Sequence, residues 1–89
     1  MQYYVYIAKS LKDNGYYIGS TSNIADREES HNAGRTKSTK VRRPLKIFYF
    51  EKYDEKPDAL KREKFLKSSK GYKEKIEIIK KHDKDHNLY

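Results

Sequence analysis

Three short runs rich in aromatic and β-branched residues interrupt an otherwise hydrophilic chain of 89 residues. They are YYVYIAK (residues 3–9), YYIG starting at residue 16, and LKIFYFEKY (residues 45–53). Residues of this kind favour β-strands. Because side chains alternate along a strand, Tyr4, Tyr6 and Ala8 should share one face of the first strand. The sequence therefore predicts a small three-stranded sheet.

The connection between the first two strands is predicted to be wider than a two-residue turn. KDNG, at residues 12–15, contains turn-forming residues. A minimal Asn14-Gly15 hairpin, however, would pair Tyr6 with Asn23, where a helix is expected to begin. In the second strand, Tyr17 and Gly19 should share a face.

Capping signals predict the first helix. Asn23 and Asp26 have the spacing of a capping box, and Gly34 suits the position after a helix end, which predicts a helix over residues 24–33. Pro57 suits the first turn of a second helix that runs to about Lys67.

Tyr72, Ile76 and Ile79 have the spacing of an amphipathic helix, which predicts a third helix after a break at Ser68–Gly71. The order β-β-α-β-α-α predicts an α+β fold with an antiparallel or mixed sheet. We expect one domain over residues 1–81 and a flexible tail over residues 82–89, because KKHDKDHNLY (residues 80–89) shows no periodicity.

The net charge of +8 favours a phosphate-rich partner, with nucleic acid before a membrane surface. No acidic residue lies between Ser30 and Phe50, and this span has no apolar helical stripe that could lie on a membrane. The candidate DNA-binding residues are Arg35, Lys37, Lys40, Arg42 and Arg43. The alternative is that the charge serves solubility alone.

The chain contains no cysteine and no apolar run long enough to span a bilayer, and Met1 leads directly into strand-like sequence without a signal peptide. A cytoplasmic location is therefore expected. The oligomeric state is left open.

Two polar residues occupy the side of the first helix that should face the sheet. Ile24, Arg27 and His31 are three and seven positions apart and form one stripe, whereas Asp26, Glu28, Glu29 and Asn32 should lie outside. Arg27 could extend to solvent or pair with an acid, and His31 could cap the helix end. The alternative is that both residues line a functional site.

Glu63 is a similar anomaly on the second helix, where it lies between the apolar positions Ala59 and Leu66. A carboxylate in such a place needs a partner because an unpaired buried charge is costly. An ion pair with Lys67, four residues further on, would draw it towards solvent. The sequence leaves both alternatives open: a half-buried carboxylate with a functional partner, or a carboxylate drawn to solvent by Lys67.

Tyr6 and Tyr17 complete the set. Each could serve packing alone, but together with Arg27, His31 and Glu63 they can converge on one side of the sheet beside a basic loop. This combination predicts a phosphodiester site.

The same residues carry a resemblance to the GIY-YIG nuclease family. YVY (residues 4–6) occupies the first motif, YIG (residues 17–19) is the second motif intact, NIADREESHNAG contains the motif arginine and histidine, and ALKREKFLK contains the motif glutamate. The chain is most similar to short single-domain bacterial members, and also resembles the catalytic modules of homing endonucleases and of the excision-repair endonuclease subunit. The match spans about residues 3–79.

The resemblance implies hydrolysis of DNA phosphodiesters with Mg²⁺ or Mn²⁺, with RNA left open as a substrate. Glu63 would be the metal ligand, and Arg27 would bind the scissile phosphate. Tyr6 would be the general base and Tyr17 would orient the water, with His31 as the alternative base or a proton relay. A phenol needs neighbouring cations to lower its pKa before it can act as a base at neutral pH.

The chain departs from the family pattern at two positions, where Tyr4 replaces the first-motif glycine and Ser20 stands where some relatives have a lysine. Structure-selective or weakly sequence-selective cleavage in DNA repair or processing is expected. A non-catalytic nucleic-acid-binding module is the alternative function, and a basic subunit that docks on an acidic protein is a third.

Overall fold

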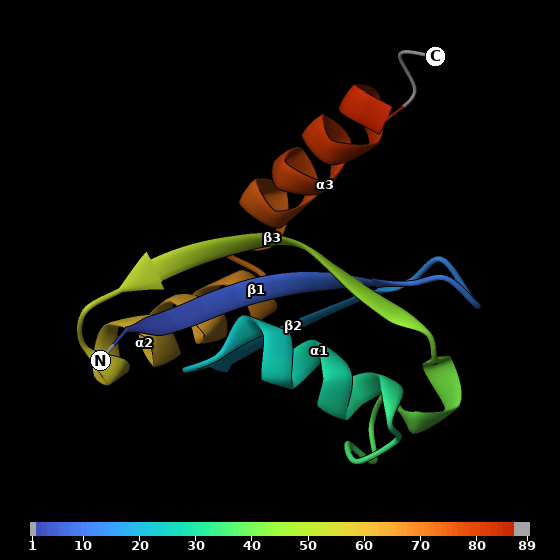
Figure 1. Ribbon diagram of the computed structural model, residues 1–89. Coiled ribbons are helices and arrows are strands. Elements are labelled where there is room, and N and C mark those ends of the chain that lie inside the picture. Colours follow the sequence, from blue (N-terminus) through green and yellow to red (C-terminus); the bar gives the residue numbers. More distant parts are fainter. Residues whose placement is uncertain (1, 87–89) are drawn as a thin grey trace.

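The computed structural model describes residues 2–86 and has the element order that the sequence predicts (Figure 1). The elements are β1 (Tyr3–Ser10), β2 (Tyr16–Thr21), α1 (Ile24–Asn32), the 3₁₀ turn η1 (Lys40–Arg42), β3 (Leu45–Tyr53), α2 (Lys56–Lys67) and α3 (Tyr72–His86). The η1 turn lies in the basic loop and was not predicted. No helix within residues 2–86 is long and apolar enough to cross a membrane.

The sheet is antiparallel throughout, with the order β2-β1-β3. The central position of β1 explains why Val5, Tyr6, Ile7 and Ala8 are all buried. The backbone N–H of Ser10 donates to the carbonyl oxygen of Gly15 at 2.9 Å, which closes a wide loop between β1 and β2. The prediction of a loop wider than two residues is therefore confirmed.

The two faces of the sheet are covered by different helices (Figure 1). On the α2 face, Val5 and Ile7 pack with Ala59 and Leu66 in the larger apolar cluster. On the α1 face, the buried apolar cluster is small, and Tyr6 is its largest member. The strand alternation predicted from the sequence is confirmed.

The ends of α1 also follow the predicted signals. The side chain of Asn23 accepts a hydrogen bond from the backbone N–H of Asp26 at 3.0 Å. Gly34 has φ +78°, a left-handed conformation that a residue with a side chain rarely adopts.

Two polar residues of α1 hold the open edge of β3. The Asn32 amide accepts from the backbone N–H of Leu45 at 2.7 Å and donates to its carbonyl oxygen at 2.9 Å. Glu28 accepts from the backbone N–H of Ile47 at 2.7 Å. These bonds satisfy edge groups that could otherwise pair with another chain. Asp26, Glu29 and Asn32 are exposed, as predicted, whereas Glu28 is half-buried because the unpaired backbone of β3 attracts its carboxylate.

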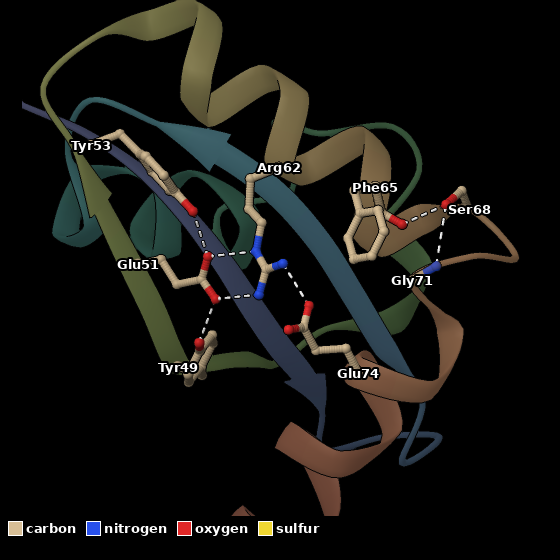
Figure 2. A network of polar contacts seen from close by, with 8 residues as sticks. All are labelled: Tyr49, Glu51, Tyr53, Arg62, Phe65, Ser68, Gly71 and Glu74. Carbon is tan, nitrogen blue, oxygen red and sulfur yellow. Dashed lines mark hydrogen bonds and ion pairs between the residues drawn. The ribbon is translucent and has the colours of Figure 1, made fainter.

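An ionic network ties β3 to α2 and α3 on the other face (Figure 2). The Arg62 guanidinium donates to both carboxylate oxygens of Glu51 at 2.8 and 3.0 Å and also pairs with Glu74. The hydroxyls of Tyr49 and Tyr53 donate to the same Glu51 carboxylate. Burial raises the pKa of Glu51, but the bonds from Arg62 and the tyrosines outweigh it, so the net pKa is lowered.

The α3 helix continues further than the sequence predicts. The His82 ring stacks on Phe48, with 4.0 Å between ring centroids. Asp83 accepts from the Tyr16 hydroxyl at 3.3 Å and lies 3.9 Å from Lys9 Nζ. These contacts with the sheet accompany a helix that continues to His86, so residues 82–86 are helical although their sequence shows no periodicity. The rest of that predicted tail, residues 87–89, lies outside the described part of the chain.

Candidate active site

Tyr6 lies across the glycine of the YIG motif. Its Cα is paired with that of Gly19 in the β1–β2 ladder, and only 1% of the residue is exposed. A Cβ atom on Gly19 would lie 2.5 Å from the Tyr6 hydroxyl oxygen, a distance that real contacts do not reach. Glycine is therefore required at this position so that the Tyr6 ring can extend over β2.

The Tyr6 hydroxyl is the first member of a buried chain of polar groups. It lies 2.7 Å from His31 Nε2, and His31 Nδ1 lies 2.7 Å from the Thr39 hydroxyl oxygen. The Thr39 hydroxyl in turn donates to the carbonyl oxygen of Thr36 at 3.4 Å. His31 is 1% exposed and Thr39 is fully buried.

One tautomer of His31 satisfies this whole chain. If Tyr6 donates to Nε2, then Nδ1–H donates to Thr39, whose own proton remains available for Thr36. Burial, with the charge of Arg27 as a smaller contribution, lowers the pKa of His31. The imidazole is therefore neutral at pH 7, and in the tautomer that satisfies the whole chain Nε2 is the acceptor.

The Tyr6 phenol is harder to ionise than a free tyrosine. Burial contributes most to the increase in its pKa, and Tyr17 and Glu63 add to the effect, while Arg27 opposes it. The expectation that nearby cations lower the pKa of Tyr6 is not met in the protein alone, because burial outweighs the single guanidinium.

Arg27 and Tyr17 supply polar groups that are free to bind a substrate. Within residues 2–86, the Arg27 guanidinium and the Tyr17 hydroxyl form no hydrogen bond, and Arg27 forms no ion pair. The Tyr17 ring centroid lies 5.1 Å from that of His31 and 6.3 Å from that of Tyr6. Both residues are half-buried, so they lie between solvent and the buried polar groups of Tyr6 and His31.

Glu63 approaches the site from α2, at the β2 edge of the sheet. The Ser20 hydroxyl donates to Oε1 at 2.7 Å, and Lys67 Nζ lies 2.7 Å from Oε2. The Glu63 side chain is 19% exposed. The ion pair with Lys67 predicted as one alternative is present, yet Glu63 stays close enough to raise the pKa of Tyr6.

The residues present fit a metal ion that is held jointly by the protein and its substrate. No group of three or more His, Cys, Asp or Glu residues within the described residues could hold a metal alone. His31 is not available as a ligand because both ring nitrogens are hydrogen-bonded. Glu63 provides a carboxylate, and Mg²⁺ accepts one or two carboxylates together with waters and phosphate oxygens.

The basic loop does not act as a single surface. Arg42 Nε lies 3.1 Å from Asp13 Oδ2, and Arg42 Nη2 donates to the Tyr16 carbonyl oxygen at 3.4 Å. Arg42 therefore fixes the β1–β2 loop, which weakens its assignment as a DNA-binding residue. The other predicted cations (Arg35, Lys37, Lys40 and Arg43) are exposed and form no ion pair within residues 2–86.

Lys40 and Arg43 line a pocket of about 530 Å³ together with a cation that the sequence analysis missed. Lys12, from the β1–β2 loop, joins them, and no acidic residue lines the pocket. Lys12 Nζ donates to the Val41 carbonyl oxygen at 3.1 Å, and Arg43 Nε donates to the Lys40 carbonyl oxygen at 2.8 Å. These hydrogen bonds hold the side chains of Lys12 and Arg43 beside the pocket.

Comparison with known proteins gives the family. The GIY-YIG catalytic domain family matches residues 2–77. The chain belongs to the GIY-YIG family. Tyr6, Tyr17, Arg27, His31 and Glu63 lie within the matched span. A nucleic-acid substrate and a divalent metal ion are general features of nucleases in this family.

Bacterial relatives cover most of this GIY-YIG chain. UPF0213 protein lwe0147 of Listeria welshimeri is 40% identical over 86 residues, which is 94% of each chain. UPF0213 protein SH2523 of Staphylococcus haemolyticus is 44% identical over 68 residues, which is 75% of this chain and 82% of the relative. The solution NMR structure of UPF0213 protein BH0048 from Bacillus halodurans has a TM-score of 0.51 and 30% identity, with 90% of this chain and 86% of that chain covered.

Proposed function

We propose that the protein is a divalent-metal-dependent endonuclease that hydrolyses DNA phosphodiester bonds. The observation that carries the proposal is the buried Tyr6–His31–Thr39 chain, which ends beside the free groups of Arg27 and Tyr17. A binding module has no need of a neutral imidazole positioned to accept a phenol proton.

Proton transfer follows the direction of this chain. The Tyr6 oxygen takes a proton from the attacking water while the Tyr6 proton passes to His31 Nε2. A concerted transfer avoids a free phenolate, which the raised pKa of Tyr6 disfavours. Thr39 accepts from Nδ1–H and so keeps His31 in the tautomer that this step needs.

The remaining residues act on the phosphate. The free guanidinium of Arg27 binds two oxygens of the scissile phosphate, which a lysine could not do in the same geometry. The Tyr17 hydroxyl orients the water. A metal ion held by Glu63 would supply positive charge for the phosphate and for the leaving oxygen.

Lys12, Lys40 and Arg43 bind a backbone phosphate of the same nucleic acid at the basic pocket. Phosphate contacts position a strand without reading its sequence. Cleavage is therefore structure-selective or weakly sequence-selective and suits DNA repair or processing; RNA offers the same phosphate chemistry.

The test is incubation with duplex, single-stranded and branched DNA, and with RNA, in Mg²⁺, Mn²⁺ or EDTA. Cleavage of DNA with metal, and none in EDTA, is expected. Glu63→Gln should lose cleavage yet bind DNA in EDTA like the wild type, because the basic pocket is unchanged. If the wild type cuts no form of DNA but binds it, the non-catalytic binding module replaces this proposal.

A further inference from the structure

Both oxygens of the Glu63 carboxylate are already occupied in the protein alone. Ser20 donates to Oε1, and Lys67 Nζ lies 2.7 Å from Oε2. The ammonium group of Lys67 therefore occupies one of the two oxygens through which Glu63 could bind a metal ion. Glu63 and Lys67 are four residues apart on α2, so they stay adjacent as long as the helix is formed.

Lys67 also faces a second residue of the site. Its Nζ lies 5.8 Å from the centroid of the Tyr17 ring, within the range of a cation–π contact. The ammonium thus lies between the proposed metal ligand and the tyrosine proposed to orient the water. This is the place where the scissile phosphate must lie if Glu63 and Tyr17 act on the same bond.

The contacts distinguish Lys67 from its neighbour on the same helix. Lys64 is also exposed, but it forms no ion pair within the described part of the chain. The Lys67 side chain is 48% exposed and the Glu63 side chain 19%, so the lysine can move towards solvent while the carboxylate stays in place. Lys64 is therefore a matched control for charge on α2.

We propose that Lys67 is a mobile cation of the proposed active site. It neutralises Glu63 in the metal-free protein, and it transfers to a non-bridging oxygen of the scissile phosphate when metal and nucleic acid bind. The proposal rests on the proposed nuclease function. No covalent bond forms or breaks, since the ammonium exchanges a carboxylate oxygen for a phosphate oxygen.

The two positions of Lys67 give effects of opposite sign. On Glu63, the ammonium repels an incoming divalent ion, so Lys67 weakens metal binding in the absence of DNA. On the phosphate, it stabilises charge that develops during cleavage. A lysine that only pairs with Glu63 to stabilise α2 would also weaken metal binding, but it would not speed cleavage, so the cleavage measurement distinguishes the two roles.

The experiment compares Lys67→Met with Lys64→Met, each against the wild type. Mn²⁺ binding to the DNA-free protein is measured by electron paramagnetic resonance, and cleavage is measured under single-turnover conditions. Lys67→Met should bind Mn²⁺ about tenfold or more tightly and should cleave about 10²-fold more slowly. Lys64→Met should match the wild type in both measurements.

Lys67→Arg is the control that separates loss of charge from a folding defect. It keeps the charge and the pair with Glu63, so its Mn²⁺ affinity should return towards that of the wild type, with unfolding followed on the same samples. Unchanged Mn²⁺ affinity in Lys67→Met overturns the placement on Glu63, and an unchanged cleavage rate overturns the transfer to phosphate.

These failures are distinct from failure of the proposed function. If the wild type cuts DNA and Glu63→Gln does not, yet Lys67→Met equals the wild type in both measurements, only the role of Lys67 is refuted. If the wild type cuts no DNA, the nuclease proposal and the transfer of Lys67 to phosphate both fail.

Discussion

Acidification should destabilise the protein through His31. The imidazole is buried between Tyr6 and Thr39, and burial lowers its pKa below the ordinary value of 6.5. The unfolded chain therefore takes up a proton at a higher pH than the folded protein does. The stability that His31 contributes is fully present above about pH 6.5 and is lost as the pH falls below it.

The magnitude follows from proton linkage. For each pH unit between the unfolded and folded pKa values of His31, the free energy of unfolding should fall by about 1.4 kcal/mol. For a domain of this size, that corresponds to roughly 6–11 °C in melting temperature per pH unit. The carboxyls of Glu51 and Asp13 also have lowered pKa values, but both titrate below their ordinary values of 4.5 and 3.8. Between about pH 5 and 6.5, the free energy of unfolding therefore responds to His31 but not to the carboxyls of Glu51 and Asp13.

The assay is urea unfolding, followed by circular dichroism at several pH values between about 5 and 8, for the wild type and His31→Gln. Glutamine retains a polar side chain at this position but does not titrate. The wild type should lose stability on acidification, and the difference between the two proteins should shrink as the pH falls. Parallel stability curves for the two proteins would refute the neutral, buried imidazole, and with it the direction of the Tyr6–His31 bond.

Three further predictions, the last with a paired control, test other parts of the structure. Tyr6→Phe should keep its fold, because the ring remains, and should slow cleavage about 10²–10⁴-fold in a single-turnover assay; turnover close to that of the wild type would remove Tyr6 from the proton path. Gly19→Ala places a Cβ against the Tyr6 hydroxyl and should cost about 1–3 kcal/mol in thermal unfolding; a neutral effect would mean that Tyr6 can move aside. Arg43→Gln should reduce the slope of log affinity against log salt by about 0.9, as expected for one lost phosphate contact, whereas Arg42→Gln should leave the slope unchanged and lower stability; the reverse result would return DNA binding to Arg42.

Most of the fold could be predicted because its signals are local. Strand alternation assigned Tyr6 and Val5 to opposite faces, and a cap at each end defined α1. The end of α3 could not be predicted, since its last turn is held by contacts of His82 and Asp83 with residues that are distant in the sequence. A helix stabilised by tertiary contacts need not show a periodic pattern.

Arg27, His31 and Glu63 stood out in the sequence as polar groups at positions expected to be apolar, but the partners of the site residues did not stand out. Thr39 is one hydroxyl in a polar loop, and only the fold brings it to His31. Lys12 resembles any turn lysine until the β1–β2 loop meets the basic loop. Arg42 and Arg43 are adjacent and chemically identical, yet Asp13 engages the first and the basic pocket contains the second. Charge counted along a sequence cannot separate them, because an ion pair depends on which loops meet.

The arrangement of α1 explains why the protein tolerates polar residues on the inner side of a helix. On the opposite face of the sheet, Ala59 and Leu66 of α2 provide an apolar core. Helix α1 is instead fastened through hydrogen bonds, from Asn32 to the edge of β3 and from His31 to Tyr6. Because both ring nitrogens of the buried His31 are paired, its burial does not carry the penalty of an unsatisfied polar group. The helix therefore needs no apolar stripe, and its inner side is available for groups that a packed core would exclude. The site thus takes Tyr6 and His31 from the α1 face of the sheet, while Glu63 reaches it from α2 at the β2 edge.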